Sequence, residues 1–379
     1  MSEWKKCRIG DLVTLRQGFA INAKSKHYIS KERTSLALLR IADMKSGSRE
    51  IFIREDIPQN FIARAEDIVY TRTGNVGLVF RNNYGVVHNN CFTVTPNDEK
   101  ALSRDFLYYL LQSKYFFEKA NSLARGAAQP DLPHSLFNSI EISYPELDCQ
   151  HRIATILSRY DSLIENYQKQ IKLLEEAAQR LYKEWFVDLH FPGHENTKIV
   201  DGVPEGWEKK KVGDMISKIQ RTKQVTTNNY QASGKIPVID QSRNYIAGYT
   251  DDAECLVKVT VPYIVFGDHT RILKYIPFSF AKGADGTQLI MSNDLERMPQ
   301  TLFYNSLIEI DLSNYSYARH FKYLKEEFVL LPSEYIARKY DSIVSRYYQS
   351  IQKSREQIRL LTEARDRLLP KLMSGEIAV

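Results

Sequence analysis

The stretch RIATILSRYDSLIENYQKQIKLLEEAAQRLYKEWF, residues 152–186, decides the fold because the chain contains a version of it twice. It returns as KYDSIVSRYYQSIQKSREQIRLLTEARDRLLPKLM, residues 339–373, with serine, arginine, isoleucine and leucine side chains in register. A shorter motif also repeats, as WKKCRIGDL from Trp4 and as WEKKKVGDM from Trp207. Two copies, each about half of the 379 residues, indicate pseudo-two-fold symmetry and not a solenoid.

Both long segments carry apolar residues at the spacing of a coiled coil. In the first copy all ten a and d positions are apolar, and in the second eight of ten are, with Ser354 and Arg365 as the exceptions. The seam is assigned to Leu157, Ile164, Ile171, Leu174, Leu181, Val344, Ile351, Ile358, Leu361 and Leu368. The pattern predicts two long helices that zip antiparallel, and two amphipathic helices packed separately on their own domains are the alternative.

The remaining sequence divides into two mixed regions. Residues 1–147 and 189–332 contain short β-like runs separated by turn residues, with one helical pattern at SRDFLYYLLQSKYFFEKANS. The segment HFPGHENTKIVDGVPEGW, rich in proline and glycine, is predicted to be a hinge at the start of the second region. The sequence therefore predicts an α+β fold in which two mixed domains alternate with a central helix, 148–188, and a C-terminal helix, 333–379.

Composition narrows the class of protein. A net charge of +6 and 52 basic residues, beside 23 tyrosines and 17 phenylalanines, permit nucleic-acid binding but also suit a mildly basic globular protein. The four cysteines show no metal-ligand or disulfide spacing, which favours reduced thiols in a cytoplasmic protein. The first residues lack an apolar signal core and no run approaches 18 apolar residues, so we expect neither secretion nor membrane insertion.

The motifs that support catalysis are missing from the sequence. There is no phosphate-binding G-x-x-x-x-G-K-[ST] loop and no H-E-x-x-H pair, and RTGNVG lies between strand-like runs, which indicates a hairpin tip. The acidic group of Asp201 and Glu208 with Lys210 falls in the predicted hinge, where no rigid element would hold a metal. We therefore expect no catalytic residue, no cofactor and no metal site.

Polar loops at comparable places in the two halves favour DNA reading instead. Arginine pairs bidentately with guanine and asparagine with adenine in the major groove, so both residue types suit a reading loop. In the first half the candidate DNA-binding residues are Thr71, Arg72, Thr73, Asn75, Asn89, Asn90, Arg125 and Gln129. In the second half they are Arg243, Asp268, His269, Thr270, Arg271, Lys282 and Gln288.

Taken together, the motifs resemble the specificity subunit of Type I restriction–modification systems over essentially the whole chain. The resemblance rests on the two W…GD motifs and on EDIVYTRTGNVGLV, GAAQPDLPHSLFNSIEISYPELDCQHRIATIL, IPVIDQSRNYIAGY, IVFGDHTRI and RDRLLPKLMSGEI. It implies a non-catalytic subunit whose two target-recognition domains each read one half of an asymmetric bipartite DNA sequence. It also implies that the helices set the spacer and dock methyltransferase subunits, two being expected, with restriction subunits joining through the complex.

Two other functions remain open at this point. A stand-alone DNA methyltransferase or nuclease would modify or cut DNA without partners. The chain could also be a coiled-coil scaffold that does not recognise DNA. Its binding would then depend neither on salt nor on nucleotide sequence.

Overall fold

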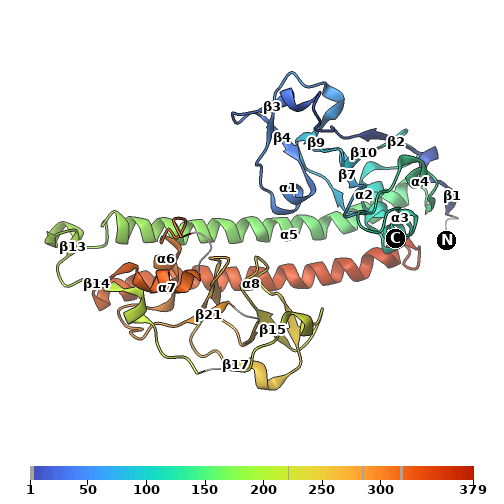
Figure 1. Cartoon of the computed structure of the whole chain (residues 1–379). Helices are drawn as coiled ribbons and strands as arrows, with labels where there is room; N and C mark the ends of the chain where they lie inside the picture. Colours follow the sequence, from blue (N-terminus) through green and yellow to red (C-terminus); the bar gives the residue numbers. More distant parts are fainter. Residues whose placement is uncertain (1–3, 221, 284–285, 316–318) are drawn as a thin grey trace. The chain divides into compact units, whose positions relative to one another are not determined.

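The computed structural model describes residues 4–220, 222–283, 286–315 and 319–379 (Figure 1). The chain divides into two compact units. Unit 1 comprises Met1–Glu165 and Ile358–Val379, and unit 2 comprises Asn166–Gln357. Each long helix therefore contributes one part to each unit.

Unit 1 combines antiparallel and parallel strand pairs with short helices. One sheet has the order β2-β10-β7-β8, a second has the order β3-β5-β4-β9-β6, and β1 pairs with β11. The strands are β1 (Lys5–Arg8), β2 (Val13–Gln17), β3 (Ile29–Ser30), β4 (Leu36–Leu39), β5 (Phe52–Ile53), β6 (Ile62–Ala63), β7 (Ile68–Thr71), β8 (Val79–Phe80), β9 (Gly85–Val87), β10 (Cys91–Pro96) and β11 (Glu141–Tyr144). The short helices are α1 (Ile41–Ser46), α2 (Arg104–Gln112), α3 (Lys114–Leu123) and α4 (His134–Asn138).

Unit 2 is built in a similar way. Its sheets have the orders β16-β15-β20-β17 and β19-β18-β21, and β14 pairs with β22. The strands are β12 (Ile199–Val200), β13 (Val203–Pro204), β14 (Glu208–Lys211), β15 (Ile236–Ile239), β16 (Gly248–Thr250), β17 (Leu256–Val257), β18 (Tyr263–Gly267), β19 (Leu273–Ile276), β20 (Phe280–Lys282), β21 (Thr287–Ile290) and β22 (Phe328–Leu331). The short helices are α6 (Gln300–Ile308) and α7 (His320–Glu326).

The strand connections of one unit recur in the other. The β7–β8 hairpin, with β10 beside β7, corresponds to the β18–β19 hairpin, with β21 beside β18. The parallel pair β4–β9 corresponds to β15–β20, and the antiparallel pair β1–β11 corresponds to β14–β22. The repeat in the sequence is thus a repeat of topology, although the strands themselves differ in sequence.

The W…GD motif recurs because it forms the same close-packed turn in each unit. The backbone N–H of Ile9 donates to the carbonyl of Ile140 at 2.9 Å, and that of Val212 donates to the carbonyl of Glu327 at 2.9 Å. A Cβ atom at Gly10 would lie 2.6 Å from the Cβ of Asn138, closer than carbon atoms pack. Glycine is therefore required there for the turn to approach its neighbour.

The two long helices are α5 (Leu147–Tyr182), which ends in a π-helical turn at Lys183–Val187, and α8 (Glu334–Met373). The helix starts are predicted to within one residue, since Leu147 and Glu334 each lie one position from the expected boundary. Gly375 follows α8 with a φ of 74°, the left-handed conformation that ends many helices.

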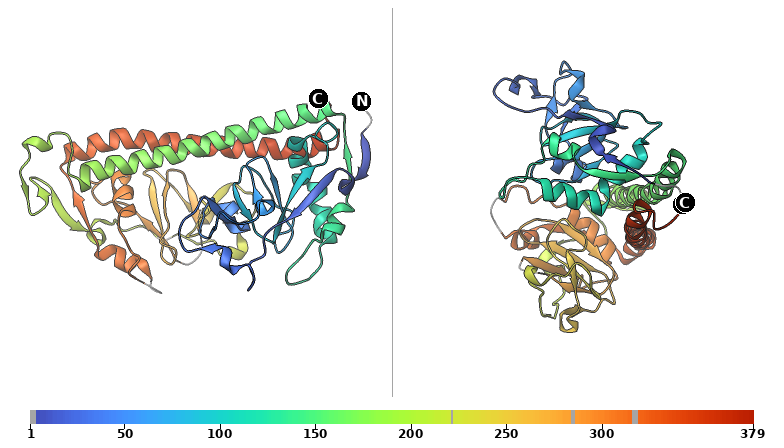
Figure 2. Two further views of the ribbon diagram at one scale, coloured as in Figure 1. Left: turned by 90° about the horizontal axis from the view of Figure 1, so that it is seen from above. Right: turned by 90° about the vertical axis from the view of Figure 1, so that its right-hand side faces the viewer.

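Within each unit the α5 segment (green) lies antiparallel to the α8 segment (red), as Figure 2 shows. In unit 2, Ser354 donates to Gln170 at 3.2 Å while Tyr340 donates to the carbonyl of Ala178 at 3.3 Å, so the partners run in opposite directions. In unit 1, Arg365 pairs with Asp161 at 2.8 Å. All ten assigned seam residues are buried or partly buried. The predicted α+β fold class, with two paired long helices, is confirmed.

In each unit the helix pair shares one core with the sheet that holds the hairpin, β7–β8 or β18–β19. The unit 1 core joins Tyr70, Phe92 and Phe137 to Leu157 of α5 and Leu372 of α8. The unit 2 core is built in the same manner around Tyr340 and Val344 of α8. Among the described helices, none combines the length and apolar character that a bilayer crossing requires.

Candidate nucleic-acid interface

The three loops singled out in the first half of the sequence lie together in unit 1. The N–H of Arg72 donates to the carbonyl of Asn90 at 2.8 Å, and the N–H of Gly74 donates to the carbonyl of Pro130 at 2.8 Å. Backbone bonds between Arg125 and Asp131 close the third loop on itself. Residues 72–78, 88–90 and 125–131 therefore form one surface, called loop cluster 1 below.

Arg72 is held in this cluster by an ion pair that sequence reading missed. Its Nε and Nη2 atoms donate to the two carboxylate oxygens of Asp131 at 3.0 and 2.6 Å, and Nη1 donates to Gln17 Oε1 at 3.0 Å. The Arg72 guanidinium holds the pKa of Asp131 below its usual range. Arg72 is thus fixed in place in the unbound chain, and its contact with a guanine stays a prediction.

The other predicted residues of this cluster divide into buried and exposed groups. Thr71 is fully buried, donates to the carbonyl of Asn75 and accepts from the N–H of Leu78, so the structure gives it a structural role in place of a DNA contact. Thr73 donates to Asp131 at 2.6 Å. Asn89 and Asn90 are half-buried, whereas the side chains free to meet solvent belong to Asn75, Arg125 and Gln129.

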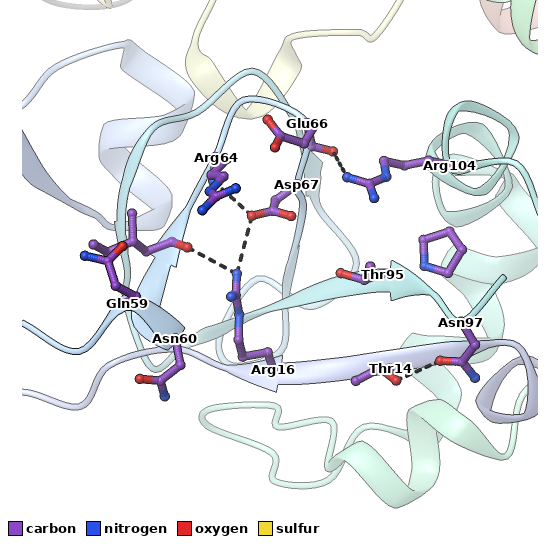
Figure 3. A pocket seen from close by; sticks show the side chains of 12 residues that line it. Thr14, Arg16, Gln59, Asn60, Arg64, Glu66, Asp67, Thr95, Asn97 and Arg104 are labelled. Carbon is purple, nitrogen blue, oxygen red and sulfur yellow. Dashed lines mark hydrogen bonds and ion pairs between the residues drawn. The ribbon is translucent and has the colours of Figure 1, made fainter. Parts of the chain in front are cut away.

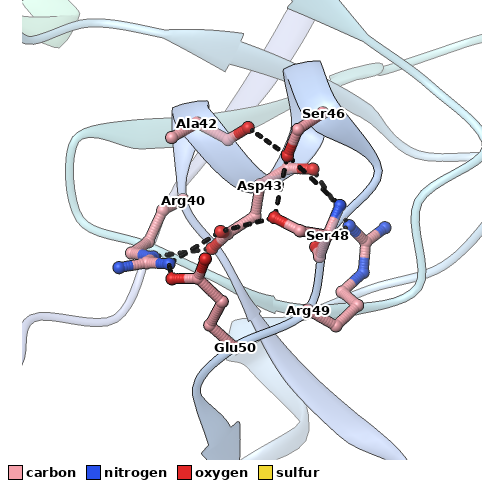
Figure 4. A network of polar contacts seen from close by, with 7 residues as sticks. All are labelled: Arg40, Ala42, Asp43, Ser46, Ser48, Arg49 and Glu50. Carbon is pink, nitrogen blue, oxygen red and sulfur yellow. Dashed lines mark hydrogen bonds and ion pairs between the residues drawn. The ribbon is translucent and has the colours of Figure 1, made fainter. Parts of the chain in front are cut away.

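A polar network fixes the loop that follows β4 (Figure 4). Arg40 forms two hydrogen bonds with Asp43, at 2.6 and 2.7 Å, and a third with Glu50 at 2.5 Å. Burial alone would raise the pKa of Asp43, but the bonds and charge of Arg40 lower it. The backbone N–H of His88 donates to the carbonyl of Leu39 at 3.3 Å, which places this network beside loop cluster 1.

Unit 2 repeats the backbone arrangement with a different side chain. The N–H of Asp268 donates to the carbonyl of Gly286 at 2.7 Å, and the carbonyl of Asp268 accepts from the N–H of His320 at 2.9 Å. These bonds match those of Arg72, whose N–H donates to Asn90 and whose carbonyl accepts from Leu132 at 2.9 Å. Asp268, and not Arg271, therefore occupies the position of Arg72.

Asp268 is another correction to the predicted set. It is 4% exposed, and its carboxylate accepts the N–H of Phe321 at 2.8 Å in the first turn of α7. A buried carboxylate with this partner anchors the helix and does not face a ligand. The sequence prediction assumed that polar residues in loops face solvent. Nothing in the sequence around Asp268 distinguishes this buried aspartate from an exposed one.

The tip of the β18–β19 hairpin carries the exposed candidates of unit 2. His269, Thr270 and Arg271 are all exposed. The side-chain oxygen of Gln241 accepts the N–H of His269 at 3.1 Å, and Thr270 donates to the carbonyl of Gln241 at 2.7 Å. Arg271 has a φ of 60° and donates to the carbonyl of Leu312 at 3.1 Å.

The loop 240–244 thus packs against the hairpin tip 268–272, and the two form loop cluster 2. Arg243 is exposed within it. Lys282 and Gln288 are half-buried at the ends of β20 and β21. Arg243 therefore joins the exposed set of unit 2.

A separate polar hollow of about 740 Å³ lies in unit 1 (Figure 3). Two of its three arginines pair with acids of the protein: Arg16 with Asp67 at 3.3 Å, and Arg104 with Glu99 at 2.7 Å. None of the predicted site residues lines it. Across the described ranges, no group of three histidine, cysteine, aspartate or glutamate side chains is arranged to hold a metal ion.

The chain is similar in sequence and in fold to proteins of Type I restriction systems. The family described as the Type I restriction modification DNA specificity domain matches residues 1–176. The specificity subunit of the Type I restriction enzyme MjaIX from Methanocaldococcus jannaschii is 27% identical over 357 residues, which cover 87% of this chain and 78% of that protein. The first 176 residues thus match a DNA specificity domain, and most of the chain is similar to a Type I specificity subunit.

Other specificity subunits are also similar to this chain. That of the HindI enzyme from Haemophilus influenzae is 27% identical over 202 residues, 50% of this chain and 42% of the relative. The crystal structure of the S subunit from M. genitalium superposes with a TM-score of 0.61, covering 98% of this chain and 96% of its own, at 19% identity. The chain therefore has the fold of this S subunit.

Proposed function

We propose that this chain acts as a Type I specificity subunit and recognises an asymmetric bipartite DNA sequence, with unit 1 reading one half and unit 2 the other. The observation that carries the proposal is that the two units share a backbone framework and differ in the side chains it holds. Arg72 and Asp268 make the same backbone bonds but differ in charge. A shared framework with different tips suits two readers of different sequences.

The exposed side chains supply the chemistry that base reading needs. Loop cluster 1 offers Asn75, Arg125 and Gln129, and loop cluster 2 offers Arg243 and the tip 269–271. Arginine, asparagine and glutamine form the bidentate contacts that distinguish guanine and adenine in the major groove. The same arginines can bind phosphates, which fixes the register without selecting a sequence.

The long helices are proposed to set the spacer between the two half-sites. Both α5 and α8 continue without a break through the boundary between the units, at residues 165–166 and 357–358. A continuous helix fixes a distance in steps of about 1.5 Å per residue. Half-sites about one helical turn apart, roughly 10 bp, are expected for two readers on one face of the duplex.

The similarity to specificity subunits supports the proposed partners. The chain would act in a complex with methyltransferase subunits, two being expected, docked on the helices, and with restriction subunits joined through that complex. The proposed target-recognition domains are residues 1–147 and 189–332. The sequence specificity of the whole complex would then reside in the two loop clusters.

Lengthening the helix tests the spacer. Four residues inserted after Gln168 add about one turn, or 6 Å, which corresponds to roughly two base pairs at about 3.4 Å each. The modified sites in a host that expresses the complex should keep both half-sites and gain a longer spacer, with some loss of stability because four residues break the heptad.

A matched insertion provides the control. Four residues added after Gly202, in the turn between β12 and β13, leave both long helices intact and should leave the spacer unchanged. If the Gln168 insertion folds and methylates at the original spacing, the helices do not set it. DNA binding that ignores both salt and sequence would favour a scaffold function.

A further inference from the structure

A buried lysine lies beneath loop cluster 2. Lys274, in β19, is 4% exposed, and its ammonium group donates to the carbonyl of Asp240 at 2.8 Å and to that of Asn244 at 2.5 Å. The carboxylate of Asp240 lies 3.8 Å away. Burying an ammonium group is costly unless partners surround it, so the loop 240–244 and the lysine hold each other in place.

The ordering of this loop extends to the hairpin tip. Gln241 lies inside the loop that Lys274 holds, and it binds both His269 and Thr270 of the tip. Arg243 lies in the same loop and is exposed. Three of the four exposed candidates of unit 2 therefore depend on the loop that Lys274 holds. Arg243 lies in that loop, and His269 and Thr270 bind its residue Gln241.

Unit 1 holds the equivalent loop in another way. Val69 pairs with Phe80 as Val265 pairs with Lys274, so Phe80 occupies the lysine position. Arg40 follows β4 as Asp240 follows β15, and the network of Arg40 with Asp43 and Glu50 locks that loop from within. Of these two equivalent loops, the one after β15 is therefore held by a charged side chain of a strand, Lys274 of β19, and the one after β4 by residues of its own.

We propose that Lys274 is a positioning residue for the second half-site: it fixes the loop 240–244 and, through Gln241, the tip 268–271, without touching DNA itself. The inference rests on the function proposed above and deepens it. In this proposal a buried side chain controls which bases unit 2 selects, because it positions the side chains that would contact them. The first half-site, read by unit 1, then serves as an internal control in the same molecule.

Selection from a random-sequence duplex library tests the inference. The full-length chain, Lys274→Met and the control Lys258→Met, which removes a lysine charge from an exposed position of the same unit, would each be used to recover bound duplexes. Lys274→Met should keep the first half-site within about twofold and lose about tenfold or more selectivity at positions of the second half-site, the scale of one base contact. Lys258→Met should keep both.

The outcomes separate the inference from the function on which it rests. An unchanged second half-site in Lys274→Met, beside a bipartite wild-type motif, overturns the inference alone. A wild-type chain that selects no bipartite motif overturns the proposed function as well. If Lys274→Met loses both half-sites, Gln241→Ala decides, because it leaves the lysine in place: selective loss of the second half-site supports the inference, and an intact second half-site overturns it.

Discussion

Units 1 and 2 hold equivalent hairpins by the same backbone hydrogen bonds but by side chains of opposite charge. In unit 1 an arginine at the hairpin binds Asp131 in the segment before α4. In unit 2 an aspartate at the same position binds a backbone N–H of α7. The loops after β4 and β15 show a similar reversal, with Arg40 in one and Asp240 in the other. The backbone framework repeats while its side chains vary, which allows specificity to change without a change of fold.

The helix pair shows a second contrast between the units. In unit 1 the seam holds Asp161, 13% exposed, which accepts from Tyr109 at 2.6 Å and pairs with Arg365 at 2.8 Å and Arg81 at 3.4 Å. In unit 2 the helices are joined by the neutral pair of Ser354 and Gln170 and by an ion pair of Arg355 with Glu175 at 3.0 Å, whose acid is 46% exposed. Polar contacts at seam positions cost stability and fix register. The charged centre of unit 1 should therefore matter more to stability.

Breaking these contacts should give the largest effect on stability. Asp161→Ala removes the acid that Arg365 and Arg81 share and leaves each with one more exposed partner, Asp366 and Asp105. It should lower the free energy of unfolding by about 2 kcal/mol, less than for a fully buried ion pair. Gln170→Ala, at an exposed position, should change it by about 0.5 kcal/mol or less. Urea denaturation of both variants, followed by circular dichroism, measures the difference. Equal losses would contradict the contrast between the two seams.

Substitution of Arg72 sharpens the comparison of the hairpins. Arg72→Ala should weaken binding of the specific duplex by about 1–3 kcal/mol and spare non-specific binding. Asp131→Ala should weaken the same half-site, because Asp131 holds Arg72 in place, whereas Asp268→Ala should affect only the second half-site. Anisotropy titrations with duplexes altered in one half-site measure each loss. Equal weakening for all duplexes, with a flatter salt dependence, would make Arg72 a phosphate contact instead.

The buried lysine predicts a smaller, pH-dependent difference. Burial lowers the pKa of Lys274 from 10.5 to about 8, with Asp240 as the opposing acidic group. The folded chain therefore releases this proton at lower pH than the unfolded chain, and stability rises as the pH passes from about 8 towards 10.5. Between pH 7.5 and 9.5 the wild-type chain should gain on the order of 1 kcal/mol relative to Lys274→Met. If the wild-type chain instead loses stability relative to Lys274→Met over that interval, the pKa of Lys274 is not lowered in the folded chain.

Much of the fold is predictable from the sequence because helices and hairpins leave local patterns. The heptads predicted the long helices, and RTGNVG predicted the hairpin tip between β7 and β8. Ser354 and Arg365 break the heptad, but their partners Gln170 and Asp161 lie about 200 residues away, so no local pattern identifies them.

The candidate site was predictable only in part. Residue type identified the loops that gather in unit 1, since asparagine favours turns and arginine, asparagine and glutamine suit contacts with bases. Which side chains face solvent depends on distant partners: Asp131 for Arg72, and Phe321 for Asp268. Lys274 was missed because a lysine within a strand-like run is ordinarily read as solvent-facing.

The central claim is that each unit reads one half of the target independently. The most direct test replaces residues 13–140 of unit 1 by the matching segment of another specificity subunit and maps the modified sites in a host that expresses the complex. One half of the recognised sequence should change, while the other half and the spacer stay the same. A replacement that changes both halves would contradict the claim.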